Sequence, residues 1–178
     1  LEGLDIWQIV DTSSYRGQKA WFAPGTLNEN DQVLFNLEPF KVTGDQPVLR
    51  FFHRYNSEPG MDGGIIQVSV AGSDYWATIT QDKVFRGSYR GTIAYNTFAI
   101  PDLRSFWGNS ESYTASYVDL SDYVGEHIYF RFRYGSDDDT ETENPILSEG
   151  WYIDDIEVME LFNYNTQACV SSRSGDLA

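Results

Sequence analysis

The sequence has very little cysteine and few basic residues. Cys169 is the one cysteine in 178 residues, so no internal disulfide can form. Lysine and arginine together number 12, against 27 aspartates and glutamates, which gives a net charge of −15. Binding to a nucleic-acid backbone or to anionic lipid needs clustered positive charge. Neither kind of partner is therefore expected.

Long apolar runs are also lacking. No segment approaches the roughly 18 apolar residues of a membrane-spanning helix, so no membrane insertion is expected. No stretch of about twelve residues repeats its apolar positions at the helical period of 3.6, so we expect little helix. The chain begins at Leu1 without methionine or a signal peptide, which is the pattern of a piece cut from a longer precursor. Its first expected partner is a neighbouring domain of that polypeptide.

Aromatic residues and short alternating segments are plentiful. The chain contains 11 Phe, 12 Tyr and 5 Trp, which is enough to build a packed core despite the high charge. Apolar residues alternate at period two in several short runs, with glycine-rich or acidic turns between them. The clearest of these predicted strands are residues 48–55, 64–70, 127–134 and 150–158.

Many short strands separated by turns are typical of stacked antiparallel sheets. We therefore predict an all-β fold, a two-sheet antiparallel β-sandwich of the jelly-roll type with little helix. The predicted domain spans residues 1–162, and the polar residues 163–178 form a tail or linker.

The predicted strand 150–158 carries an unusual carboxylate. Period two places Asp154 on the same face as Tyr152, Ile156 and Val158, which would point it toward the core. A buried carboxylate costs several kcal/mol unless a cation or several donors meet it. Two interpretations stay open: Asp154 caps a loop by accepting main-chain N–H bonds, or it binds Ca²⁺.

A second acidic feature is the bent loop 58–64 (EPGMDGG), in which Glu58 and Asp62 lie four residues apart. Ca²⁺ takes six to eight oxygen ligands in flexible geometry, whereas Mg²⁺ demands an octahedron. Zn²⁺ is poorly served, because His53 and His127 lack a close-spaced motif. The alternative is that this loop is a solvated acidic turn.

Residues 137–143 (DDDTETE) form a dense acidic run without the glycine and flanking helices of an EF-hand. A solvated loop explains such a run, and Asp137 is the member best placed to reach a site. His53, in the middle of a predicted strand, is either a core residue or an orienting partner of Glu58.

No motif for catalysis stands out. The sequence has no Gly-x-Ser-x-Gly elbow, no His-Glu-x-x-His and no phosphate-binding loop, and 27 acids make any one carboxylate pair uninformative. Several aromatic residues could instead stack on sugar rings, although core packing also explains them. These are Trp21, Trp76, Trp107, Tyr89 and Tyr95.

A set of motifs together resembles a known family. They are residues 49–55 (LRFFHRY) with Glu58, residues 62–70 (DGGIIQVSV) with Trp76, residues 118–123 (VDLSDY) with Gly125, residues 131–133 (RFR) with Ser136 and Asp137, and residues 150–156 (GWYIDDI). This combination resembles the MAM-like jelly-roll accessory domain of immune inhibitor A-type secreted metallopeptidases and other bacterial surface proteins.

The resemblance implies a structural Ca²⁺ site that includes the closing Asp-Asp strand. Carried over, Asp154 would be a ligand, Glu58 and Asp62 its partners, and Asp155 a substitute. Glu2 matches an early glutamate that often contributes. The cysteines of eukaryotic MAM domains and the zinc motif of the family's peptidase domain are missing, so neither animal-type adhesion nor peptidase activity carries over.

The sequence thus predicts a non-catalytic, Ca²⁺-stabilised β-sandwich module of a larger secreted or cell-surface bacterial protein, serving adhesion or binding of a substrate or partner. The expected metal ligands are Glu58, Asp62, Asp154 and Asp155. Expected partners are a neighbouring domain and an extracellular protein or glycan. The alternative is a carbohydrate-binding module with an aromatic platform.

Overall fold

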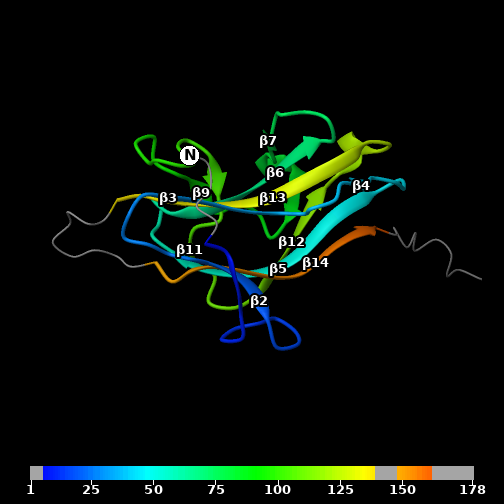
Figure 1. The fold of residues 1–178 in the computed structure, drawn as a ribbon. Helices are drawn as coiled ribbons and strands as arrows, with labels where there is room; N and C mark the ends of the chain where they lie inside the picture. The colour runs from blue at the N-terminus through cyan, green and yellow to red at the C-terminus, as the bar shows by residue number, and fades with distance from the viewer. Residues whose placement is uncertain (1–5, 139–147, 162–178) are drawn as a thin grey trace, which may run out of the picture.

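Two antiparallel β-sheets pack face to face in the computed structural model, which describes residues 6–138 and 148–161 (Figure 1). Sheet A runs in the order β1 (Gln8–Val10), β2 (Ala20–Pro24), β14 (Gly150–Glu160), β5 (Pro47–Ser57), β12 (Thr114–Asp119), β8 (Val84–Arg86), and β11 (Gly108–Asn109) also pairs with β5. Sheet B runs in the order β3 (Asn30–Phe35), β13 (His127–Ser136), β6 (Gly63–Val70), β7 (Ala77–Thr78), and β4 (Phe40–Lys41) also pairs with β13. The predicted all-β, two-sheet antiparallel sandwich is confirmed.

Helix is confined, within the described ranges, to two single 3₁₀ turns, η1 (Gln81–Lys83) and η2 (Ser121–Tyr123). The break that Pro39 introduces separates β3 from β4, and both strands pair with β13. Proline cannot donate to a ladder, which explains why one strand does not continue through this position.

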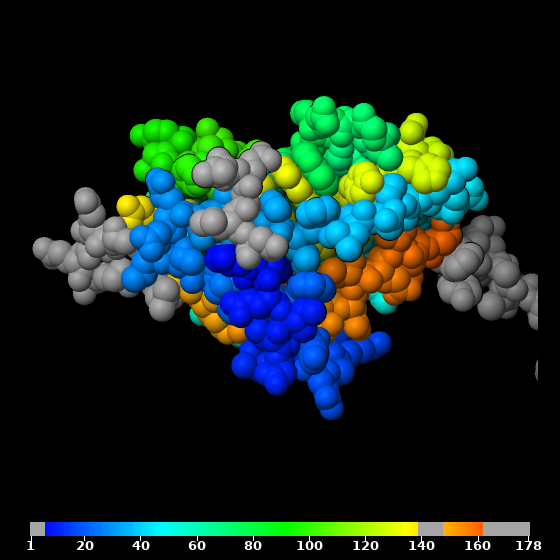
Figure 2. All heavy atoms as spheres, viewed as in Figure 1, coloured from blue at the N-terminus to red at the C-terminus, as the bar shows by residue number. Residues whose placement is uncertain are grey.

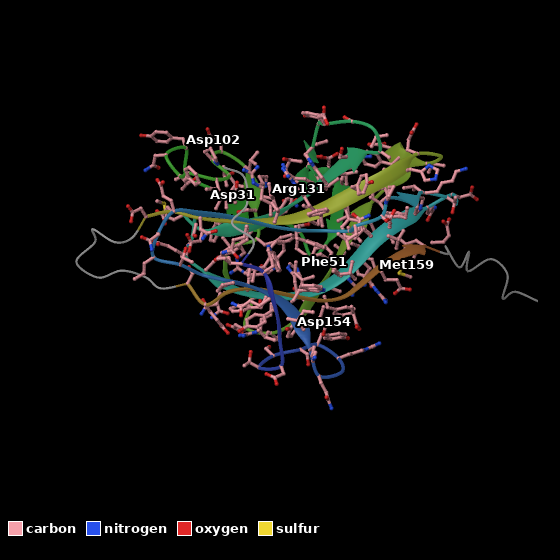
Figure 3. All side chains as sticks on the ribbon, in the orientation of Figure 1. Asp31, Phe51, Asp102, Arg131, Asp154 and Met159 are labelled. Atoms are coloured by element: carbon pink, nitrogen blue, oxygen red, sulfur yellow. The ribbon has the colours of Figure 1, made fainter. Side chains whose placement is uncertain are left out.

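The core lies between the two sheets. From sheet A, β5 contributes Leu49, Phe51 and His53, all at most 1% exposed, and Figure 3 shows Phe51 between the sheets. From sheet B, β13 contributes Ile128 and Phe132, which are fully buried. The rings of Phe51 and Phe132 meet edge to face with centroids 5.0 Å apart. The alternation that the sequence shows on these two strands therefore gives the correct inward faces.

On β14 the inward face differs from the predicted one. Trp151 lies opposite Tyr55 and Ile153 opposite His53, and both Trp151 and Ile153 are fully buried. Asp154 consequently points out of the sandwich, not into it. A β-bulge follows at residues 154–157, where Asp155 adopts a positive φ of 46°. Because a bulge shifts the alternation by one residue, Ile156 and Val158 do not share the outward face of Asp154, and Val158 lies opposite the buried Leu49.

A third layer covers part of the outer face of sheet B. The ribbon of β9 (Gly91–Thr92) and β10 (Arg104–Ser105) lies over this face (Figure 1). It buries a small separate cluster formed by Ile65, Ile93 and Ile100. The two strands of this ribbon pair antiparallel, with Thr92 opposite Arg104 and Gly91 opposite Ser105.

Candidate metal site at the polar end of the sandwich

One end of the interior is polar. Here Gln32 lies opposite Tyr134 and Asn30 opposite Ser136 across the β3–β13 pair, at the end where β5 finishes in Ser57. The side chains that gather at this polar end are buried, each at most 7% exposed; they are Asn30, Gln32, Ser57, Asp62, Tyr134, Ser136 and Ser148. Burying so many polar groups is unfavourable unless each of them finds a partner.

Asp62 joins three chain segments at the polar end. Its carboxylate is 2% exposed and accepts a hydrogen bond from the main-chain N–H of Asp137 at 3.1 Å and another from the hydroxyl of Ser148. The Ser148 oxygen accepts a hydrogen bond from the N–H of Glu58 at 2.9 Å. The loop that carries Glu58 and Asp62 is thereby connected both to the end of β13 and to the segment just before β14.

Two buried oxygens of the polar end have no hydrogen-bond partner among the residues that the structure describes: Oδ1 of Asn30 and Oε1 of Gln32. The buried hydroxyl of Tyr134 lies near the hydroxyls of Ser148 and Ser57. The amide of Gln32 donates to the carbonyl oxygen of Pro24 at 2.8 Å, so its orientation is fixed. Such oxygens call for a water or an ion, since buried acceptors are rarely left unsatisfied.

The charge of the Asp62 carboxylate acts on the Tyr134 hydroxyl. Burial raises the pKa of Tyr134 well above its ordinary value, and the negative charge of Asp62 raises it further. The nearby hydroxyls of Ser57 and Ser148 act in the opposite direction. Tyr134 therefore stays a neutral phenol, which offers a lone pair next to a buried carboxylate.

The structure does not bring the four predicted metal ligands together. Glu58 and Asp62 lie at the polar end, but Asp154 pairs with Phe52, six residues back along β5 from Glu58. At the rise of a β-strand this is about 20 Å, whereas Ca²⁺ binds its ligands at roughly 2.3–2.6 Å. Figure 3 shows Asp154 on the outer side of sheet A. The predicted single site that joins the loop to Asp154 and Asp155 is wrong.

Asp154 instead caps a loop. Its Oδ2 accepts hydrogen bonds from the main-chain N–H groups of Tyr15 at 2.7 Å and Arg16 at 3.1 Å, and its Oδ1 accepts one from Asp155 at 2.8 Å. The Tyr15 ring stacks on Phe52 with centroids 3.7 Å apart, which holds the loop against sheet A. Of the two interpretations that the sequence left open, the structure supports capping.

His53 is a core residue rather than a partner of Glu58. The indole N–H of Trp151 donates to Nδ1 at 3.0 Å, so Nε2 carries the proton and donates to the Ser116 hydroxyl at 2.9 Å. Ser116 in turn donates to the carbonyl oxygen of Gly87. Burial lowers the pKa of His53 from 6.5 to about 3.

The acidic run 137–143 and Glu2 add little to the description of the site. Of the acidic run, only Asp137 and Asp138 belong to the described residues; residues 139–143 and Glu2 lie outside them. Across 6–138 and 148–161, no three His, Cys, Asp or Glu side chains are grouped closely enough to hold a metal by themselves. A cation at the polar end would therefore need neutral oxygens as well.

The aromatic residues suggested as a sugar platform do not form one surface. Tyr89 is 4% exposed and lies in the core, and Trp107 packs against the small cluster under the third layer. Trp21 on β2 is 37% exposed, whereas Tyr95, 80% exposed, follows β9 in the layer over sheet B. The two exposed rings thus belong to different parts of the fold.

No protein-family model matches this chain, and a search of curated proteins finds no match to its sequence. The resemblance to MAM-like domains therefore stays a prediction. Within the described part of the chain, no helix has the length and apolar character needed to cross a membrane.

Proposed function

We propose that this chain is a non-catalytic binding module of a larger secreted or cell-surface bacterial protein, and that Ca²⁺ stabilises its polar end. One observation carries the proposal: three buried oxygens, on Asn30, Gln32 and Tyr134, gather at the same end of the sandwich as the buried Asp62 carboxylate. A cluster of oxygens that includes a carboxylate is the ligand set that a hard cation such as Ca²⁺ binds.

The residues at this end fit calcium better than other metals. Asp62 and Glu58 would supply charged oxygens, and Asn30 and Tyr134 would supply neutral ones. Main-chain carbonyls and water complete the six to eight oxygens that Ca²⁺ takes. A bound Ca²⁺ supplies positive charge that compensates the buried carboxylate. Asp154 and Asp155 take no part in this proposed site, because Asp154 caps the loop at Tyr15 and Arg16 on the outer side of sheet A and Asp155 pairs with Arg16.

The benefit to the module is mechanical. Asp62, Asp137 and Ser148 belong to three separate segments, whose ends meet at the polar end. A ligand that binds only the folded state adds about 3–4 kcal/mol to its stability at 100 to 1,000 times Kd. Such a site would fix the ends of β5, β13 and β14 relative to one another, which suits a domain that must present a surface.

Thermal unfolding with calcium and with a chelator tests the proposal. For a chain of this length, 3–4 kcal/mol corresponds to a rise in Tm of roughly 6–16 °C in Ca²⁺ relative to EDTA. Magnesium should reproduce little of the rise. The D62N variant should lose it, whereas D154N should lower both midpoints and keep the difference. Equal midpoints in Ca²⁺ and EDTA for the unaltered protein would refute the metal site.

A further inference from the structure

Sheet A extends beyond sheet B at one side of the sandwich. Within the described residues β3 is the last strand of sheet B, whereas sheet A continues past β14 into β2 and β1. In Figure 2 the blue residues of the first strands lie next to the orange residues of β14 on the viewed face. Along this open edge Ile9 is 56% and Trp21 37% exposed. The inner face of β2 and β1, which a further strand of sheet B would cover, is therefore partly exposed.

A pocket of 250 Å³ lies between the sheets at the open edge. Leu34, Phe130 and Phe132 line it from sheet B, and Trp21 and Ile156 line it from sheet A. Phe132 is fully buried, so the pocket reaches the sandwich core. Its lining suits one large aliphatic or aromatic side chain that enters from the side.

The outer edge of β3 offers main-chain hydrogen-bonding groups beside this pocket. Asn36 donates its N–H to the carbonyl oxygen of Phe130 at 3.4 Å, which fixes the phase of the ladder with β13. In an antiparallel pair these bonds alternate along the strand. The N–H and C=O groups of Val33 and Phe35 therefore face away from β13, toward the open edge.

Side-chain contacts block the first half of β3, so an added strand could pair only with the second half. Gln32 bridges the two sheets through its bond to Pro24. Asp31 is 7% exposed and forms a two-pronged pair with Arg133, with both contacts at 2.8 Å. A paired charge of this kind on an edge strand disfavours the addition of another strand. The same protection is not seen at Val33 and Phe35.

Charge decides between the possible occupants. A net charge of −15 opposes the pairing of two copies of this chain along β3. The exposed Glu29 and Glu38 flank β3 at its two ends. Asp155, beside the neighbouring pocket, is already paired with Arg16 at 3.8 Å, and Lys19 also lines that pocket. Glu29 and Glu38 therefore form an acidic rim at the two ends of β3, beside an apolar pocket.

We propose that the open edge binds an extended peptide segment of a partner protein, in which large apolar residues alternate with basic ones. The segment pairs antiparallel with Val33 and Phe35, one apolar side chain fills the pocket under Trp21, and the basic residues point to the acidic rim. Strand addition of this kind takes affinity from the main chain and specificity from the pocket. The inference rests on the proposed binding role but not on calcium.

The test uses an acetylated and amidated hexapeptide in which lysine alternates with leucine or valine. Titration into the ¹⁵N-labelled protein should shift the amide signals of Val33 and Phe35 and change the fluorescence of Trp21. A control peptide, N-methylated at alternate main-chain nitrogens, keeps the charges and side chains but cannot form a ladder. Equal binding of both peptides would mean unspecific charge attraction and would overturn the proposal.

Two variants at one position isolate the main-chain contact. V33P removes an N–H that faces away from β13, where proline is tolerated at a sheet edge. V33T keeps that N–H and changes only the side chain. We expect V33P to weaken peptide binding roughly five- to tenfold and V33T to preserve it. Unfolding midpoints in Ca²⁺ and in EDTA, measured on each variant, separate this test from the test of the metal site.

Other outcomes would overturn the proposal. These are the absence of any shift at Val33 and Phe35 at millimolar peptide, self-association of the protein through β3 in sedimentation experiments, or a Trp21 response to xylo-oligosaccharides and not to the peptide. If V33P unfolds, F35P serves the same purpose, because the Phe35 N–H also faces the open edge.

Discussion

The burial of His53 predicts a specific loss of stability in acid. His53 is 1% exposed, accepts a hydrogen bond from Trp151 and donates one to Ser116, so the fold requires the neutral ring in one tautomer. Protonation would place a donor against the indole N–H and a charge in the core. The perturbation is a change from pH 7 to pH 4.5, combined with the variant H53Q.

The size of the effect follows from the pKa values. Burial lowers the pKa of His53 from 6.5 to about 3 on folding, so between these values the unfolded chain binds one more proton than the folded protein. Stability is thus fully present above pH 6.5 and falls as the pH drops toward 3. The limiting slope is 1.36 kcal/mol per pH unit. Integration from pH 7 to pH 4.5 gives a loss of roughly 2–3 kcal/mol from this one group.

Urea unfolding at several pH values measures the effect. Many carboxylates titrate in the same range, so the informative quantity is the difference in slope between the unaltered protein and H53Q. We expect H53Q to be less stable at pH 7, because the ring packing and a hydrogen bond are lost, but to lose roughly 2–3 kcal/mol less on acidification. The control is H127Q, which removes the exposed histidine at the start of β13 and should follow the unaltered protein. Parallel pH profiles for the unaltered protein and H53Q would show that His53 does not cause the loss of stability in acid.

Two further predictions concern the capped loop and the close approach of Gly64 to Trp151 between the sheets. D154N should lower the free energy of unfolding in urea by roughly 1–3 kcal/mol, because main-chain donors lose a charged acceptor. D155G should leave the stability unchanged or raise it, since Asp155 has a φ of 46°. An equal loss in both variants would contradict the capping role. G64A should lower stability by about 2 kcal/mol or more, because an added Cβ would lie 2.4 Å from the Trp151 ring. G72A, where a Cβ meets nothing within 4 Å but φ is 89°, should cost about 1 kcal/mol; a G64A protein as stable as G72A would count against the packing described.

Much of the fold can be predicted from local alternation. The faces of β5 and β13 are correct because each strand alternates regularly and has no bulge, as Phe51 and Phe132 show. The face of β14 is wrong because Tyr152 is apolar enough to pass for a core residue, although it stacks on Phe22 outside the sandwich. The bulge at Asp155 then brings Ile156 back toward the core, and no residue type announces a bulge when glycine is absent.

The residues of the candidate site, like the fold, could be predicted from the sequence only in part. The bent loop with Glu58 and Asp62 can be recognised, because glycine, proline and acids concentrate in a few residues. The neutral oxygens of Asn30 and Gln32 were missed, although both share the inward face of β3 with Leu34. A polar residue at such an inward position is a signal that the sequence alone provides. The distance between Asp62 and Asp154 could not be predicted, because it depends on the register of β14 against β5.

Calorimetric titration of Ca²⁺ into the metal-free protein tests the central claim most directly. The account predicts saturable binding of one ion, abolished in D62N and retained in D154N, because only Asp62 lies at the polar end. No binding heat in the unaltered protein at any temperature tested, or identical binding by D62N, would contradict it.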